Sequence, residues 1–454
     1  MSRRIIPHGE CGKSGTGTAA CEGQQVSVES TAKETLAQDL MEVVCSRINL
    51  NRAYKRVKSN KGSPGLDGMT VEELGPYIKM HKDEIVSSLL EGRYQPQAVK
   101  GVEIPKPKGG TRQLGIPTVL DRLIQQAIYQ VLEPIFEPRF SNSSYGFRPK
   151  RSAHQAIKAA TEYVKSGKRW VVDIDLMKYF DQVNHDILMS RLARVVGDKA
   201  VLKLIRKFLQ AGMMVNGVVM ERQAGTPQGG PLSPLLSNIM LNELDWELEK
   251  RGHTFCRYAD DCNIYVSSEK AGRRVMESVK QFLASKLKLQ INEVKSAVAQ
   301  VHERQFLGYR IGKTGWLCLS DDSLKRMKDK VRQLTKRNRG VSLERVIKSL
   351  NMYLPGWFQY YSQITGIDLW VKLDSWIRRR LRCYRLKQRK RKWPIATYLM
   401  KLGVDTRNAW RLAKSDKSWW RKSHNPIINT AMPNSWFETL GLFSLYYKAK
   451  ALRA

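Results

Sequence analysis

The spacing of apolar positions divides the chain into three parts. Residues 1–37 are rich in Gly, Ser, Thr and Gln and show little periodicity, so we expect them to form a disordered tail. From Leu40 onwards apolar residues recur at helical spacing, and helix and strand patterns then alternate to about residue 315. Beyond that residue the strand patterns disappear and only helical spacing remains. The pattern predicts an α+β body followed by an α-helical final third.

Individual elements can be predicted within these parts. In the body, a helix is expected from about Thr118 to Ile135, and Gly109-Gly110 is expected to form the turn of a hairpin. Three apolar faces at helical spacing mark the final third of the chain. These faces are Leu324, Met327, Val331 and Leu334; Val346, Ile347, Leu350 and Tyr353; and Leu373, Trp376, Ile377 and Leu381.

One predicted strand carries two carboxylates. The segment Arg169-Trp-Val-Val-Asp-Ile-Asp-Leu176 contains the β-branched run that is typical of a buried strand. Alternation places Val171, Asp173 and Asp175 on one face of this strand. Two acids that share a face with nothing basic between them are costly to bury unless a cation or hydrogen-bond donors compensate.

A predicted hairpin carries two more carboxylates. Asp260 and Asp261 lie between the apolar runs 254–258 and 263–266, which predicts two strands with both acids at the tip. Adjacent like charges at a turn repel each other, so this arrangement suggests a hard divalent cation. Together the two motifs are expected to form a cage for one or two Mg²⁺ ions that act in phosphoryl transfer. The alternative is that the first pair caps a strand end and the second is a solvated turn.

The composition indicates the class of partner. The chain has 454 residues with 78 Lys plus Arg against 42 Asp plus Glu, a net charge of +36, which suits a phosphate polyanion. No run of 18 apolar residues and no apolar signal region occurs, so the protein is expected to be neither secreted nor membrane-spanning. Its seven cysteines form no Cys-x-x-Cys pair, which indicates neither a zinc site nor a disulfide framework and fits a reducing cytoplasm.

Ordered blocks of sequence resemble those of reverse transcriptases. They are Asp175 followed by Phe180, Gly225-Thr-Pro-Gln-Gly-Gly230, Tyr258-Ala-Asp-Asp261 and Phe306-Leu-Gly-Tyr309. Further blocks resemble the bacterial group II intron-encoded reverse transcriptases and maturases in particular. These are Gly65-Leu-Asp-Gly68, Ile104-Pro-Lys-Pro through Arg112-Gln-Leu-Gly-Ile-Pro-Thr118, Ser144-Tyr-Gly-Phe-Arg-Pro149, Leu350-Asn351, Gly356-Trp357 and Tyr360-Tyr361.

The resemblance implies an RNA-directed DNA polymerase with the right-hand fold. Asp175, Asp260 and Asp261 would then be the catalytic and metal-binding triad for Mg²⁺, with Mn²⁺ as a possible substitute, and Asp173 a neighbour on the same face. The implied nucleotide-binding residues are Lys100, Lys106, Arg112, Phe180, Gln228 and Lys295. Phe180 would exclude a 2′-hydroxyl by a steric clash, unless it is an ordinary core aromatic, and Lys295 would neutralise the leaving pyrophosphate, unless it is a solvated helix-end residue. If the family match is wrong, Lys100, Lys106 and Arg112 are ordinary surface charges.

The same resemblance implies residues that bind nucleic acid. They are Phe306, Gly308 and Tyr309 at the primer end, although these also suit a core and turn, and Lys325, Arg332, Arg378, Arg379, Arg380 and Arg382 on the later helices. Residues 371–454 hold 21 Lys plus Arg against 4 Asp plus Glu, interleaved with Trp393, Trp410, Trp419, Trp420 and Trp436. Aromatic rings among cations suit single-stranded nucleic acid, while most of these tryptophans taken singly also suit a small helical core.

The expected domains are a tail at 1–37, fingers at 38–165, a palm at 166–316, a thumb and maturase domain at 317–393 and a basic DNA-binding region at 394–454. The expected partners are group II intron RNA, an RNA template, a DNA primer or target and deoxynucleotide triphosphates, with no membrane. The protein would act in the bacterial cytoplasm, and at the nucleoid when on target DNA. No paired cysteines and histidines of an endonuclease follow Cys383, so no second-strand cleavage is expected. Two alternatives are a reverse transcriptase of another lineage, for host defence or diversity generation, and a maturase that only binds RNA.

Overall fold

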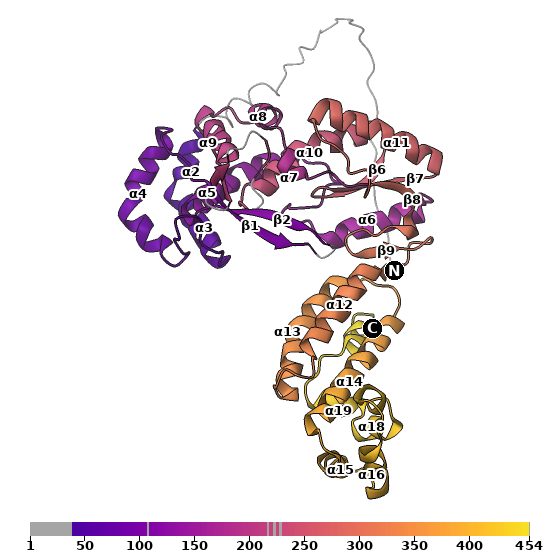
Figure 1. The fold of residues 1–454 in the computed structure, drawn as a ribbon. Helices are drawn as coiled ribbons and strands as arrows, with labels where there is room; N and C mark the ends of the chain where they lie inside the picture. Colours follow the sequence, from indigo (N-terminus) through magenta and orange to yellow (C-terminus); the bar gives the residue numbers. More distant parts are fainter. Residues whose placement is uncertain (1–38, 107–108, 216–217, 221–223, 227–228, 454) are drawn as a thin grey trace, which may run out of the picture.

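The computed structural model describes residues 39–106, 109–215, 218–220, 224–226 and 229–453. Figure 1 shows a broad α/β body from which a long helical part, here called the stalk, extends downwards. The stalk consists of the helices α12 to α20, from Asp321 to Ala451. The predicted α+β body with a helical final third is confirmed, and the predicted tail at residues 1–37 lies outside the described residues.

The first half of the body is mostly helical. Its elements are α2 Leu40–Cys45, α3 Arg47–Ser59, α4 Leu74–Leu90, β1 Val99–Pro105, β2 Thr111–Ile116, α5 Val119–Phe136, a 3-10 turn at Glu137–Arg139, and α6 Ala153–Lys165. Thr118 begins α5 as predicted, because its hydroxyl accepts a hydrogen bond from the Asp121 amide. The strands β1 and β2 form the predicted antiparallel hairpin, with Gly109 and Gly110 at positive φ.

The second half of the body contains the central sheet. Its elements are β3 Trp170–Ile174, α7 Tyr179–Gln182, α8 His185–Ala193, α9 Lys199–Gln210, β4 Met213–Val215, β5 Val218–Met220, α10 Ser233–Lys250, β6 Thr254–Tyr258, β7 Asp261–Val266, α11 Glu269–Phe282, a π-helical turn at Leu283–Leu287, β8 Ala297–Gln300, a 3-10 turn at Val301–Glu303, β9 Tyr309–Ile311 and β10 Leu317–Leu319. The strand β10 lies just beyond residue 315, where the sequence pattern predicted that strands would end.

The central sheet separates two hydrophobic cores. Its strand order is β6-β7-β3-β8, and all three neighbouring pairs are antiparallel. On one face, Val172 and Ile264 belong to a core shared with the helices of the body. On the other face, Val171 and Tyr265 belong to a core that continues into the stalk. Because β3 is buried on both faces, its run of β-branched residues is explained.

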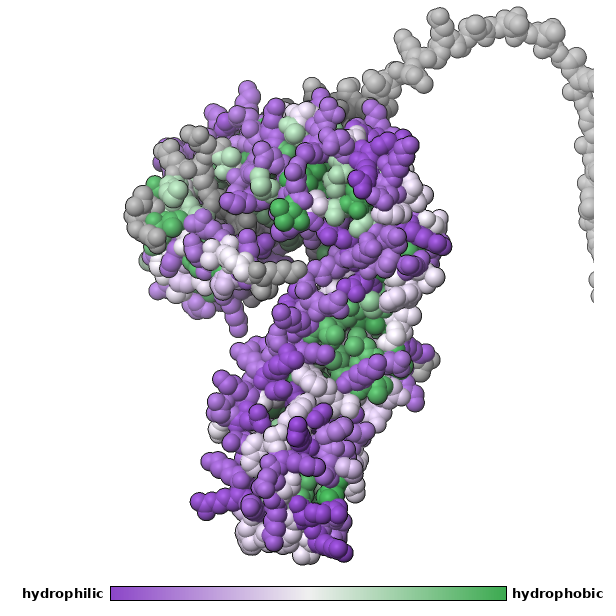
Figure 2. All heavy atoms as spheres, turned by 45° about the vertical axis from the view of Figure 1, so that its right-hand side comes forward, coloured by the Kyte–Doolittle hydropathy of each residue, from purple (hydrophilic) through white to green (hydrophobic). Residues whose placement is uncertain are grey.

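The stalk is built from helices that follow one another closely. They are α12 Asp321–Leu334, α13 Leu343–Tyr361, α14 Asp368–Arg389, α15 Lys392–Lys401, α16 Thr406–Lys414, α17 Trp419–Lys422, α18 Pro426–Ala431, α19 Asn434–Thr439 and α20 Leu445–Ala451. Each of the three predicted apolar faces lies on one of the first three helices, and at least two of its four residues are buried. Hydrophilic side chains cover most of the face in Figure 2, and hydrophobic ones gather in a patch on the upper stalk.

Candidate active site

The tip of the β6–β7 hairpin is a two-residue turn. Tyr258 pairs with Asp261, so Ala259 and Asp260 alone connect the strands. Ala259 has a φ of +59°, a conformation that tight hairpin turns require and that residues with a Cβ seldom adopt. The turn places Asp260 and Asp261 next to each other at the end of the hairpin, as the sequence predicted.

The register of the sheet brings Asp175 to the same place. In the antiparallel pairing of β3 with β7, Asp173 lies opposite Asn263 and Ile174 opposite Cys262. Continuing this register by one residue places Asp175 opposite Asp261. Its backbone is held by the segment before β8, because its amide donates to Ser296 Oγ at 2.9 Å and its carbonyl accepts from the Asn292 amide at 2.8 Å.

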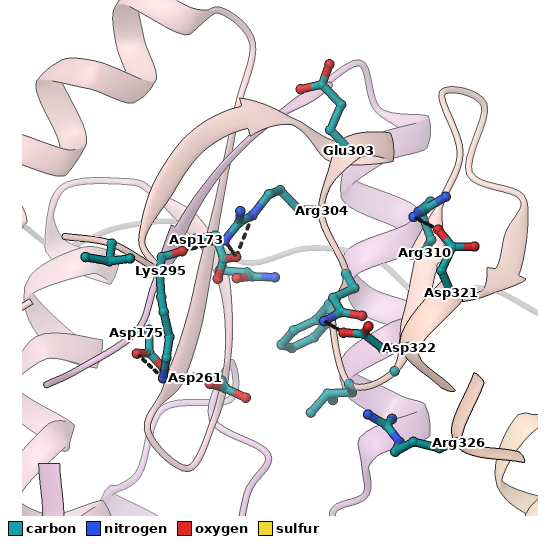
Figure 3. A pocket seen from close by; sticks show the side chains of 16 residues that line it. Asp173, Asp175, Asp261, Lys295, Glu303, Arg304, Arg310, Asp321, Asp322 and Arg326 are labelled. Atoms are coloured by element: carbon teal, nitrogen blue, oxygen red, sulfur yellow. Dashed lines mark hydrogen bonds and ion pairs between the residues drawn. The ribbon is translucent and has the colours of Figure 1, made fainter. Parts of the chain in front are cut away.

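These acids face a large open pocket. A cavity of about 600 Å³ is lined by Asp173, Asp175 and Asp261 on one side and by the start of α12 on the other (Figure 3). The turn at 306–308 and Arg326 complete its wall, while Asp260 lies beside the pocket rather than in its lining. The pocket is therefore bounded by both the sheet of the body and the first helix of the stalk.

The carboxylates disfavour each other's charge. Burial raises the pKa of Asp260, and repulsion from Asp175 raises it further, while Arg112 and Lys295 oppose both effects. Although Asp261 as a residue is exposed at the tip, desolvation of its carboxyl and repulsion from Asp260, Asp173 and Asp175 raise its pKa to about 7.

Two basic residues compensate part of this negative charge. Lys295 Nζ donates to Asp175 Oδ2 at 3.0 Å, and Arg304 donates to Asp173 Oδ2 from Nε at 2.8 Å and from Nη2 at 2.6 Å. Figure 3 shows Lys295 reaching Asp175 beside Asp261, and Arg304 closing over Asp173 from the other side. The sequence indicated Lys295 but not Arg304, since an arginine within a charged segment gives no local signal of its partner.

The carboxylates of this site do not lie close enough together to form a complete metal-binding site. Within the described residues, no group of three or more His, Cys, Asp or Glu side chains has an arrangement that could hold a metal ion. The kind of donor nevertheless fits Mg²⁺, which prefers carboxylate and carbonyl oxygens. Asn263 Oδ1, buried in the same pocket, has no hydrogen-bond partner in the part of the chain that the structure describes and is a further oxygen ligand. Asp173 differs from the other acids because it accepts two hydrogen bonds from the Arg304 guanidinium.

The basic residues of the β1–β2 hairpin differ in their distance from the acids. Lys100, Lys106 and Arg112 are all exposed. Arg112 alone is near enough to Asp260 to lower the pKa of that carboxyl. Lys106 lies at the end of β1, where its amide donates to the Gly110 carbonyl at 2.9 Å. Arg112 is therefore the residue of this hairpin whose charge acts on the site.

Phe180 is partly buried and packs edge-on against Tyr179, with 5.2 Å between ring centroids. Its carbonyl accepts a hydrogen bond from the Thr226 amide at 2.7 Å, which attaches the loop at 224–230 to α7. Gly229 in this loop lies so close to the Gly115 carbonyl that a Cβ would come within 2.6 Å of that oxygen. The loop thus bridges α7 and β2, while the predicted nucleotide contact Gln228 lies outside the described residues.

The predicted primer-end residues join the body to the stalk. Phe306 and Tyr309 are buried, so their rings belong to the core, which was the alternative for this motif. Between them Gly308 has a φ of +82° and lines the pocket. The hydroxyl of Tyr309 donates to the Tyr360 carbonyl, and the hydroxyl of Tyr360 donates back to the Leu307 carbonyl at 2.9 Å. Phe306, Leu307 and Gly308 line the pocket, whereas Tyr309 does not.

The predicted nucleic-acid contacts of the stalk fall into two classes. Lys325 and Arg332 are exposed on α12. Arg382 on α14 is buried and donates to the Met432 carbonyl from Nε at 3.0 Å and Nη2 at 2.7 Å, while burial lowers its pKa to about 10. The prediction for Arg382 is corrected, because its guanidinium holds α14 to the following helices. Periodicity could not show this, since the acceptor is a distant backbone carbonyl.

The neighbouring arginines are also engaged within the stalk, although they stay partly exposed. Arg379 lies over Trp420 with 4.0 Å from its guanidinium carbon to the ring centroid, Arg380 donates to Thr335 Oγ1 at 2.6 Å, and Arg378 lies 4.0 Å from Asp374. Of the five interleaved tryptophans, Trp393 is exposed and the other four are partly buried. Cations lie over Trp410, Trp419 and Trp420, so these rings pack inside the stalk as well as facing solvent.

Comparisons with known proteins agree with this fold. Residues 104–311 match the reverse transcriptase (RNA-dependent DNA polymerase) family, and residues 324–402 match the group II intron maturase-specific domain. The chain is 34% identical to protein YkfC of Escherichia coli strain K12, over 60% of this chain and 83% of that protein. It is 31% identical to the group II intron-encoded protein LtrA of Lactococcus lactis subsp. cremoris, over 62% of this chain and 60% of LtrA. A nuclear intron maturase of Arabidopsis thaliana is 30% identical over 31% of this chain and 18% of that protein.

The chain is a reverse transcriptase, an RNA-directed DNA polymerase. Within that class it belongs to the group II intron-encoded reverse transcriptases and maturases, because its maturase domain follows the polymerase domain directly. The predicted family, fold class and enzyme class are therefore confirmed. Among the described residues, no helix is both long and apolar enough to cross a membrane. The five described cysteines are free.

Proposed function

We propose that DNA synthesis takes place at the pocket where the hairpin tip meets the end of β3, with Asp175, Asp260 and Asp261 holding two Mg²⁺ ions. The observation that carries this proposal is the convergence of acids from β3 and the β6–β7 hairpin on one pocket, with the pKa values of Asp260 and Asp261 raised by burial and mutual repulsion. A divalent cation relieves that repulsion. Metal ions held by these carboxylates would supply Lewis-acid chemistry for the primer 3′-hydroxyl and for the leaving pyrophosphate.

The remaining residues bind and orient the substrates. Arg112, and farther out Lys106 and Lys100, would attract the triphosphate, with Arg112 able to form a bidentate contact. Lys295, which pairs with Asp175, would neutralise the departing pyrophosphate. Phe180 would select deoxynucleotides by excluding a 2′-hydroxyl, and Gln228 would contact the nucleotide. The backbone of Gly308 would support the primer end.

We propose that the stalk binds the parent intron RNA. This binding would stabilise the splicing-competent form of the RNA and guide the RNA into target DNA. The support is the exposed basic surface of α12, including Lys325 and Arg332, together with the maturase-specific match over residues 324–402. Mixed cations and aromatic rings in the later helices suit a nucleic-acid partner of either kind. A lineage that serves host defence is disfavoured, because the maturase domain is present.

Primer extension on an RNA template with Mg²⁺ and deoxynucleotides tests the site. Replacing Asp260 and Asp261 together with alanine is expected to abolish synthesis, because the cation ligands are lost, while RNA binding measured by filter retention persists. The charge-matched control is Asp83→Ala with Asp186→Ala, two exposed acids on α4 and α8. Synthesis by the hairpin variant at the rate of this control would refute the site assignment.

A further inference from the structure

A buried ion pair lies directly behind the hairpin tip. Arg257 in β6 and Asp245 in α10 both have side chains with no exposed surface. Arg257 donates to Asp245 Oδ1 from Nε at 2.7 Å and to Asp245 Oδ2 from Nη2 at 2.5 Å. Removing two charges from water is unfavourable unless their hydrogen bonds are fully satisfied, so such a pair indicates a specific requirement.

Every N–H group of the Arg257 guanidinium has an acceptor. Besides the two bonds to Asp245, Nη1 donates to Asn238 Oδ1 at 3.0 Å and to the Ala259 carbonyl at 2.9 Å, and Nη2 donates to Ser144 Oγ at 2.8 Å. A guanidinium has five N–H donors in a fixed plane, and all five are used. Arg257 therefore connects α10, the loop before α6 and the turn of the hairpin through one rigid group.

The bond to Ala259 acts on the turn itself. This carbonyl belongs to the peptide that joins Ala259 to Asp260. Its orientation therefore determines the backbone from which the side chains of Asp260 and Asp261 extend. Ala259 holds a φ of +59°, and a residue with a Cβ stays in this region only when its surroundings determine it strongly. The guanidinium supplies one such constraint from inside the protein.

A loop supplies the second constraint from the other side of the turn. The Arg257 amide donates to the Ser143 carbonyl at 2.9 Å, and the Tyr145 amide donates to the Arg257 carbonyl at 2.8 Å. Gly146 then lies against Ala259, so close that a Cβ at this position would overlap the Ala259 amide nitrogen. Asn238 joins the two constraints, because its Nδ2 donates to the Gly146 carbonyl at 2.9 Å.

We infer that Arg257 is a positioning residue for the catalytic hairpin, fixing the Ala259–Asp260 peptide so that Asp260 and Asp261 present their carboxylates in the geometry needed for metal binding. This inference rests on the proposed role of Asp260 and Asp261. An ordinary buried ion pair would stabilise the fold but leave the affinity for metal unchanged. The two cases therefore differ in a measurable quantity.

The test is Arg257→Lys, which keeps the positive charge beside Asp245 but cannot reach all the acceptors in one plane. Metal binding by the whole protein without nucleic acid is measured with Mn²⁺ by electron paramagnetic resonance, and kcat by primer extension. We expect Mn²⁺ binding to weaken about tenfold or more and kcat to fall about 10- to 100-fold, because residues that orient metal ligands have effects of this size. The KM for template–primer is expected to stay unchanged, and hydrogen exchange at residues 258–261 to accelerate.

The matched control is Arg191→Lys, which alters a largely buried ion pair to Glu243 on the same helix α10 but away from the hairpin. This variant is expected to keep the Mn²⁺ affinity and kcat of the wild type. If folded Arg257→Lys also keeps both values, the positioning role is overturned.

Two further variants keep the test decisive. Should Arg257→Lys fail to accumulate as folded protein, Ser144→Ala removes one of the five bonds and leaves the ion pair, and it is expected to weaken Mn²⁺ binding roughly three- to tenfold. Unchanged binding in Ser144→Ala would then refute the inference. The Asp260→Ala, Asp261→Ala double variant distinguishes the two proposals. If this double variant still synthesises DNA, the site assignment is refuted. If it does not, but the folded Arg257→Lys or Ser144→Ala variant behaves like the wild type, only the role of Arg257 is refuted.

Discussion

Gly308 lies where the polymerase body meets the stalk. A Cβ at this position would lie 2.6 Å from Tyr361 Oη and 2.9 Å from Ser323 Oγ, and the backbone has a φ of +82°. The two stalk residues are themselves joined by a hydrogen bond of 3.0 Å between Tyr361 Oη and Ser323 Oγ. Both the space and the conformation therefore require glycine here.

Gly308→Ala is expected to lower the free energy of unfolding by about 1–3 kcal/mol, because it combines an unfavourable φ with a close contact. Gly356→Ala is the matched control, since this glycine lies inside α13 and a Cβ there would meet nothing within 4 Å. The control is expected to raise stability by about 0.5–1 kcal/mol through helix propensity. Urea unfolding measures both values, and equal changes in the two variants would contradict the steric explanation.

The positions of the four acids could be predicted from local sequence patterns. Which basic residues pair with these acids could not be predicted in this way. Strand alternation and the turn pattern located Asp173, Asp175, Asp260 and Asp261, because local periodicity determines which face a strand residue occupies. Arg304 pairs with Asp173 across 131 positions of sequence, and nothing local distinguishes it from other arginines. Ion pairs between distant residues depend on the register of the sheet, and this register cannot be inferred from a single sequence.

At the level of elements, basic helices serve two purposes that look alike in sequence. Both α12 and α14 carry many Lys and Arg residues around an apolar seam. On α12 Lys325 and Arg332 are exposed, although Arg332 also pairs with Asp329 and lies over the Trp376 ring. On α14 the arginines bind carbonyls, hydroxyls and aromatic rings of neighbouring helices. The presence of these helices and their apolar faces could be predicted from the sequence. The contacts of each basic side chain could not, because they depend on which helices pack against it.

This difference predicts opposite effects for two substitutions. Lys325→Gln is expected to reduce the slope of log affinity for RNA against log salt by about 0.7–0.9, since one phosphate contact is lost, and to leave the Tm unchanged. Arg382→Gln is expected to lower the free energy of unfolding by about 2–4 kcal/mol, because two charge-assisted hydrogen bonds to Met432 are lost.

Fluorescence anisotropy with RNA at several salt concentrations, together with thermal unfolding, distinguishes these effects. An Arg382 variant with wild-type stability and weakened RNA binding would contradict the structural role. A Lys325 variant with an unchanged salt slope would remove that residue from the RNA contact.

Across the whole molecule, the body and the stalk share one hydrophobic core. Tyr309 in β9 is completely buried, and its ring lies 5.2 Å from that of Tyr361 in α13. The backbone continues this contact, because the Thr365 amide donates to the Leu317 carbonyl at 2.9 Å. The overall arrangement in Figure 1, a body with an attached stalk, could be predicted from the change in periodicity near residue 315, but this shared core could not.

A chain ending at residue 319 is therefore not expected to fold as a stable monomer. It would expose Tyr309, Ile311 and Leu317 from the second core, and each buried apolar side chain contributes about 1.5–3 kcal/mol. Size-exclusion chromatography and thermal unfolding of this truncated chain check the prediction. A monodisperse monomer with a cooperative transition would show that the body is independent of the stalk.

The central place of β3 also affects how the protein is made. This strand is synthesised before both of its neighbours, since β7 begins at Asp261 and β8 at Ala297, yet it lies between them in the sheet. While a ribosome adds the intervening residues, two unpaired edges of an apolar strand remain available to other chains, a condition that favours aggregation. The pocket cannot form until the segment at 295–326 has emerged, so slow synthesis or scarce chaperones would reduce the yield of folded protein before any substrate is met.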